Sequence, residues 1–233
     1  LDEVLAVADE ITVLRDGEVV ARLDPGKTTV IEIAEKMVGR PAAVVKHATP
    51  IARRGGAPKL DIRDLAVDMP GEKVENVTLA IEQGEVLGLA GLAGHGKVGI
   101  ANGLMGLFPA RGTVLKDGGR FALNDPRAAI RAGLAFVSED RRGAGLLPDE
   151  SIEANIAITA IEAQNRFLHT GPIAPLRLLD GGAMRRHALE MIRALDVRSM
   201  GPRQAVRRLS GGNQQKVCLA RAMTLEPDTL LVS

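Results

Sequence analysis

Several residue types that carry particular functions are scarce or missing in this chain of 233 residues. It has one cysteine, Cys218, so it cannot form an internal disulfide, which suits a reducing compartment. It has four phenylalanines and neither tryptophan nor tyrosine, which argues against nucleic-acid modules that stack bases on aromatic side chains. No run of eighteen apolar residues occurs, so we expect no membrane-spanning helix. The first residues also lack the pattern of a signal peptide.

A strong charge of either sign is missing as well. The chain carries 30 basic and 29 acidic residues, so its net charge of +1 creates no field that would attract nucleic acid or acidic lipid. Its hydrophobic content of 45% and charged content of 25% are ordinary for a globular protein. The length allows one good domain and a fragment of another.

The first 40 residues form a unit of their own in the sequence pattern. We expect a short helix over 1–9, two strands over 11–14 and 18–23 joined by an Asp-Gly hairpin turn, and a helix over 28–38. This piece is too small to bury a core alone. Residues 41–58 are rich in proline and glycine and are predicted to be a linker, after which a second domain begins.

The remaining residues, 59–233, alternate between strand and helix signals. The mostly apolar run over 85–90 is followed by a glycine and predicts a buried parallel strand. The other predicted strands are 60–67, 77–81, 113–115, 120–122, 134–137 and 229–232, and the predicted helices are 98–107, 127–131, 149–164, 183–195 and 213–223.

A glycine-rich loop with a lysine lies between the predicted strand 85–90 and the helix that follows it. The loop reads Gly91, Leu92, Ala93, Gly94, His95, Gly96, Lys97. Its glycines let backbone N–H groups wrap a phosphate, and Lys97 would add a positive charge for the outer phosphates; the alternative is a bare turn. Val98 stands where such loops carry Ser or Thr, whose hydroxyl holds magnesium, so this loop offers no oxygen there. His95 fills a variable position of the loop.

A second glycine-bearing turn precedes the predicted helix 213–223. It reads Leu209, Ser210, Gly211, Gly212, Asn213, Gln214, followed by another glutamine and a lysine. Ser-Gly-Gly before a helix directs backbone N–H groups and the positive end of the helix dipole at whatever lies ahead, and an anion is the natural ligand. The same three residues also suit a plain helix entry with no ligand.

The complete octet resembles the signature motif of ABC-type ATPases. Its Asn-Gln-Gln-Lys ending is similar to the branch that powers bacterial monosaccharide importers of the ribose, galactose and xylose type. The resemblance implies an α/β P-loop NTPase fold of ABC type, with an antiparallel β-subdomain and a helical signature subdomain. It also implies that residues 1–40 are the C-terminal remnant of a first ATP-binding half, that 41–58 is a linker, and that 59–233 is a second ATP-binding domain truncated at its metal-binding strand.

The same resemblance assigns roles to individual residues. Leu209 to Gln214 would close over ATP that the phosphate loop of a partner domain holds. Residues 138–143 look like the Q-loop, in which Glu139 would sense magnesium and nucleotide as the catalytic residue; the alternative is an acidic loop with weak surface ion pairs. The family's magnesium-binding Asp would fall on Ser233. Val98 and Ser233 together therefore predict weak or absent magnesium binding at this half's own site.

By resemblance, the chain is the ATP-binding and hydrolysing component of an ABC sugar importer, with ATP and Mg²⁺ as cofactors. Its partners would be another ATP-binding half, a transmembrane permease and, indirectly, a periplasmic sugar-binding protein, and not nucleic acid. It would lie peripherally on the cytoplasmic face of the bacterial inner membrane. One alternative is a degenerate, non-catalytic half that only completes a partner's ATP site. Another is an ABC-type ATPase of DNA repair or translation, against which the signature ending, the balanced charge and the few aromatics argue.

Overall fold

The structure, a computed structural model, describes residues 1–15, 17–39, 57–138, 140 and 145–233. It divides into two compact units, Leu1–Ala52 and Arg53–Ser233, each of which is described by itself. Most of the predicted linker lies outside the described residues, and so does Glu139. None of the helices in the described ranges is both long and apolar enough to cross a membrane.

The first unit has the four elements that its sequence predicts. They are α1 (Asp2–Val7), β1 (Ile11–Arg15), β2 (Glu18–Leu23) and α2 (Val30–Val38). The two strands pair antiparallel. Thr29 caps α2 by accepting a hydrogen bond from the backbone N–H of Glu32 at 3.2 Å. Among the described residues of this unit, the buried cluster consists of Ile11, Val13 and Ile33, as a piece of this size allows.

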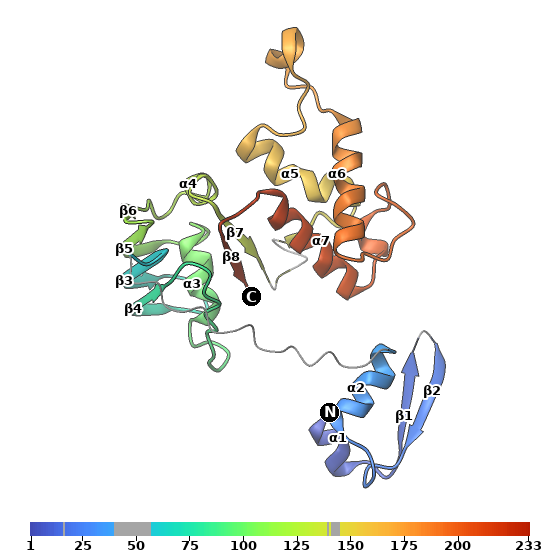
Figure 1. Cartoon of the computed structure of the whole chain (residues 1–233). Helices are drawn as coiled ribbons and strands as arrows, with labels where there is room; N and C mark the ends of the chain where they lie inside the picture. Colours follow the sequence, from blue (N-terminus) through green and yellow to red (C-terminus); the bar gives the residue numbers. More distant parts are fainter. Residues whose placement is uncertain (16, 40–56, 139, 141–144) are drawn as a thin grey trace. The chain divides into compact units, whose positions relative to one another are not determined.

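An antiparallel sheet with the strand order β4-β3-β5-β6 makes one side of the second unit. Its members are β3 (Leu60–Val67), β4 (Val74–Ile81), β5 (Ala110–Lys116) and β6 (Gly119–Arg120). Helix α3 (Lys97–Leu104) lies beside this sheet in Figure 1. Leu104 at its end joins Leu60, Ile62 and Val114 of the sheet in one buried cluster, so α3 is held against β3 and β5.

Helices make the other side of the second unit (Figure 1). The main ones are α5 (Ile152–Gln164), α6 (Gly181–Ala194) and α7 (Gly211–Thr224), with the 3₁₀ turns Gly171–Leu176 and Val206–Arg208. The short helix α4 (Pro126–Arg131) instead places Ala129 in the buried cluster of the antiparallel sheet. The Ser151 side chain caps α5, and the Asp125 side chain caps α4. Between the sheet and these helices, β7 (Leu134–Val137) pairs parallel with β8 (Thr229–Val232).

The predicted buried strand over 85–90 is wrong. These residues form no strand, and the Val86 side chain is 97% exposed. Among the described strands, β8 pairs only with β7. The 84–89 segment does not pair with β8; both line a cavity of about 830 Å³. An apolar run becomes a strand only where a neighbour accepts and donates its backbone hydrogen bonds. The sequence shows the apolar run but not whether the neighbouring strand is present.

Candidate functional site

The glycine-rich loop leads directly into α3. Residues 91–95 are exposed, whereas Gly96 is buried and caps the helix with a left-handed φ of 83°. Such a conformation turns the chain sharply, so the N–H groups of the loop and of the first helical turn face the same side. The loop therefore lies immediately before a helix N-terminus, as its sequence predicts, although the strand predicted to precede it is absent.

The N–H groups of this loop converge on an anion that the chain itself supplies. The carboxylate of Glu72 accepts a hydrogen bond from the N–H of Gly94 at 2.8 Å and a longer one from the N–H of Val98 at 3.4 Å. These backbone donors, with that of Gly94 dominant, lower the pKa of Glu72 although partial desolvation opposes them, and the Lys97 charge adds to the lowering. The loop is thus arranged to hold a negatively charged oxygen group.

Backbone packing brings Glu72 to this position. The turn between β3 and β4 lies against the glycine face of the loop and of α3. A Cβ at Gly96 would come within 2.6 Å of the Lys73 carbonyl oxygen, and one at Gly99 within 2.2 Å of the Glu72 carbonyl oxygen. Both distances are shorter than real Cβ contacts, so only glycine at these positions lets the turn approach. The glycines that weaken α3 as an isolated helix therefore serve its packing.

Lys97 and Val98 occupy the first turn of α3. The Nζ of Lys97 donates to the Leu92 carbonyl oxygen at 3.1 Å, so the side chain folds back across the loop. Val98 is 7% exposed and presents only methyl groups, and its carbonyl oxygen accepts from the side-chain amide of the buried Asn102 at 2.9 Å. The helix start therefore offers a positive charge and backbone amides, but no side-chain hydroxyl at position 98.

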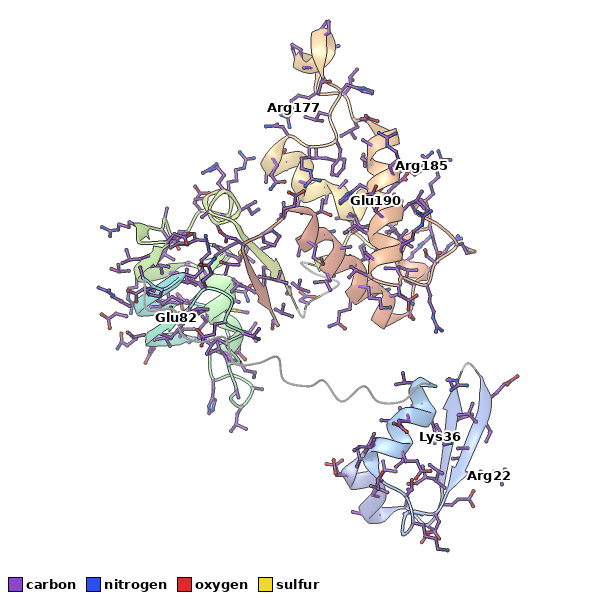
Figure 2. The ribbon with its side chains drawn as sticks, in the orientation of Figure 1. Arg22, Lys36, Glu82, Arg177, Arg185 and Glu190 are labelled. Carbon is purple, nitrogen blue, oxygen red and sulfur yellow. The ribbon has the colours of Figure 1, made fainter. Side chains whose placement is uncertain are left out.

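The 830 Å³ cavity brings Lys97 and Val98 together with Ser233. Glu82, labelled in Figure 2, also lines it. Ser233 follows β8, and its N–H donates to the Val137 carbonyl oxygen at 3.0 Å. The two positions at which the sequence predicts lost magnesium ligands thus share one cavity. The described ranges contain no group of three His, Cys, Asp or Glu side chains that could hold a metal ion. The backbone amides and Lys97 beside this cavity are donors that suit phosphate oxygens.

The second predicted turn caps α7. Ser210 and both following glycines are exposed, while Leu209 is buried. The Ser210 Oγ accepts from the side-chain amide of Asn213 at 2.9 Å, and the Asn213 Oδ1 accepts from the backbone N–H of Arg198 at 2.9 Å. Asn213 therefore braces the turn from within.

Gln214 also supports this turn rather than facing solvent. Its Nε2 donates to the carbonyl oxygens of Leu209 and Val206, at 3.2 and 3.3 Å. Asn213 and Gln214 thus hold the backbone of the Ser210 turn in place, and the exposed part is Ser-Gly-Gly. Of the predicted residues 209–214, these three are exposed, whereas Leu209 is buried and Asn213 and Gln214 are half-buried.

The second turn does not line the 830 Å³ cavity that the first helix start lines. None of residues 209–214 is among the described residues that line the 830 Å³ cavity beside Lys97. Leu209 belongs to the buried cluster of the helical side, whereas α3 packs on the antiparallel sheet. Sequence reasoning missed Glu72, which belongs to no motif. Its only signal is an acidic residue in a Pro-Gly turn between two predicted strands, and only the fold places that turn on the loop.

The elements and the loop define an α/β nucleotide-binding fold of the P-loop type. The sequence model described as "ABC transporter" matches residues 74–232, and the chain belongs to this family. The predicted fold class is confirmed. Among solved structures, a dimeric, post-hydrolysis state of the ATP-binding cassette MJ0796 bound to ADP and Pi matches 74% of this chain and 72% of its own, with a TM-score of 0.57 and 23% identity. A nucleotide-free ATP-binding cassette from an ABC transporter matches with a TM-score of 0.59 and 20% identity, covering 75% and 68% of the two chains.

Curated relatives point to the same branch. The chain is 38% identical over 222 residues to the ribose import ATP-binding protein RbsA of Burkholderia mallei. The matched region covers 95% of this chain and 42% of that protein. It is 33% identical over 238 residues to the xylose import ATP-binding protein XylG of Pseudomonas savastanoi pv. phaseolicola, covering 100% of this chain and 44% of that protein. The chain therefore spans less than half the length of these relatives.

Proposed function

We propose that this chain is part of the ATP-binding subunit of a bacterial ABC-type monosaccharide importer. The names of its relatives support the sugar class, and the phosphate loop supports nucleotide binding. The observation that carries the proposal is the convergence of the Gly94 and Val98 amides on a carboxylate, because donors that hold one oxyanion in this way suit a phosphate as well.

Each part of the site has a defined task in this proposal. The amides of residues 94–98 hold the phosphates of ATP, and Lys97 turns from the Leu92 carbonyl to the outer phosphates. Hydrolysis of the terminal phosphate of Mg²⁺-bound ATP would supply the free energy. The exposed Ser210, Gly211 and Gly212 close over the ATP of another ATP-binding half.

The importer would contain further components. A transmembrane permease would receive the motion of the two halves, and a periplasmic sugar-binding protein would deliver the sugar. The subunit would lie on the cytoplasmic face of the inner membrane. Glu139 would take part in catalysis and contact the permease. Leu209, Asn213 and Gln214 would shape the Ser210 turn, which would meet the other ATP-binding half.

A second candidate is a degenerate half that binds nucleotide without hydrolysing it. The buried Val98 favours this candidate, because it places methyl groups where a magnesium-binding hydroxyl is expected, and Ser233 brings no carboxylate to the same cavity. Such a half would still present its Ser210 turn to a partner. Under either candidate, we expect the isolated chain to hydrolyse ATP negligibly, because no ATP site in it is complete.

Calorimetric titration of the full chain with ATP tests the nucleotide site. We expect Lys97→Ala to weaken binding by about tenfold or more, because it removes the charge that faces the outer phosphates. Lys73→Ala is the matched control: its ammonium pairs with Glu75 at 2.6 Å and is 66% exposed, so affinity should change by less than about twofold. Equal affinity of Lys97→Ala and the unaltered chain would refute the assignment.

Magnesium-dependent turnover of a complete two-half protein distinguishes the two candidates. In a colorimetric phosphate-release assay, Lys97→Ala should leave the rate unchanged if this half is degenerate. A rate that falls with Lys97→Ala would reject the degenerate half and favour a catalytic one.

A further inference from the structure

Two glutamates of the β3–β4 region lie three residues apart and face different surroundings. Glu75, in β4, pairs with the exposed Lys73 and is itself 66% exposed. Glu72, in the turn, directs its carboxylate into the phosphate loop and accepts hydrogen bonds from the Gly94 and Val98 amides. The carboxylate of Glu72 therefore occupies donors that a nucleotide phosphate would need.

We propose that Glu72 is an affinity-determining residue of the phosphate loop, whose carboxylate holds the loop amides until a polyphosphate displaces it. The inference rests on the proposed nucleotide site and adds a competitor to it. An N–H group satisfied by a carboxylate gains little when a phosphate oxygen replaces that carboxylate, so part of the binding free energy is lost in the exchange.

The position of this competitor is fixed by packing rather than by the carboxylate alone. The backbone of residues 71–73 contacts the glycine face, with the Gly71 carbonyl oxygen 3.4 Å from where a Cβ of Gly94 would be. The closer approaches at Gly96 and Gly99 hold the same turn. Glu72 thus returns to the loop whenever the turn keeps its place, and its effective concentration there is high.

This exchange selects ligands by charge. A phosphate that replaces Glu72 must compensate for the loss of the charge-assisted hydrogen bonds between the Glu72 carboxylate and the loop amides. It must also replace the favourable interaction of that carboxylate with the Lys97 charge. A diphosphate or triphosphate can do so because its second and third phosphates reach Lys97 as well. Inorganic phosphate offers a single group and should compete poorly. The loop with Glu72 in place is therefore selective for polyphosphates.

Calorimetric titration of the full chain measures this effect with ATP and with inorganic phosphate. Glu72→Gln keeps the side-chain length but removes the charge, so ATP should bind about tenfold more tightly and the advantage of ATP over phosphate should shrink. Glu72→Ala should behave alike, which guards against a new interaction of the glutamine. Glu75→Gln is the control, because it removes the same charge three residues away; ATP affinity should stay within about twofold.

Amide hydrogen exchange without nucleotide provides an independent readout. Exchange at Gly94 and Val98 should speed up in Glu72→Gln and stay unchanged in Glu75→Gln. Weaker ATP binding in Glu72→Gln, or unchanged exchange, would overturn the inference. If Glu72→Gln binds ATP with the same affinity as the unaltered chain, the role of Glu72 is rejected but the nucleotide site is not. If neither the unaltered chain nor any variant binds ATP, the nucleotide site itself is rejected.

Discussion

Replacement of Gly99 by alanine tests whether close packing fixes the phosphate loop. The new Cβ would lie 2.2 Å from the Glu72 carbonyl oxygen and 2.8 Å from a methyl group of Val74, so the β3–β4 turn or α3 must move. Overpacking of this kind costs about 1–3 kcal/mol, and contact with backbone rather than a flexible side chain favours the upper end. Alanine returns about 1 kcal/mol as a better helix former than glycine. The free energy of unfolding should therefore fall by about 2 kcal/mol.

Native-state hydrogen exchange of the α3 and β4 amides measures this loss within the larger unit. A decrease of about 2 kcal/mol should speed their exchange by roughly 30-fold. Gly181→Ala is the control, since no atom lies within 4 Å of its added Cβ at the start of α6; stability should stay unchanged or rise slightly. If Gly99→Ala were as stable as the unaltered chain, the packing argument for the loop would be refuted.

Three further predictions concern the loop, the pH dependence of stability and the second turn. Val98→Thr should strengthen ATP binding several-fold in the presence of Mg²⁺ and not in EDTA, as calorimetry would show; equal gains in both would contradict the account of the missing hydroxyl. Burial raises the pKa of Asp228, but hydrogen bonds from Lys116 and Lys59 outweigh it, so the pKa is lowered in the folded chain. Its stabilising effect should be fully present above about pH 4 and should decrease as pH falls through the lowered pKa, so Asp228→Asn should lower the melting temperature more at pH 7 than at pH 2.5. In a complete two-half protein, Ser210→Ala should lower turnover at the partner's ATP site and leave nucleotide affinity at this loop unchanged; a loss of affinity at this loop alone would contradict the cross-partner role.

Much of the fold could be predicted because its signals are local. Thr29, Asp125 and Ser151 each precede a helix that the structure shows they cap. The phosphate loop was predicted from its glycines and lysine, and it does lie before a helix start. These features depend on a few neighbouring residues, so the sequence contains nearly all the information that decides them.

Other features depend on residues far apart in the chain. The apolar run over 85–90 lacks a pairing strand among the described residues, so its pattern predicted a strand that does not form. Glu72 reaches the loop because Gly94, Gly96 and Gly99, which follow it by 22–27 positions, have no side chains to keep the backbone of its turn away. Neither its charge nor its neighbours in sequence reveal this contact. The helix-weakening glycines 99 and 103 have the same explanation, since a Cβ at Gly103 would also lie 2.3 Å from a methyl group of Val67.

Backbone amide NMR of the full chain during ATP titration shows whether the two glycine-bearing turns bind different ATP molecules. If they do, the signals of Gly94, Gly96 and Val98 shift with ATP while those of Ser210 and Gly212 stay in place. Shifts at both turns with one shared saturation curve, or shifts at the Ser210 turn alone, would contradict this assignment.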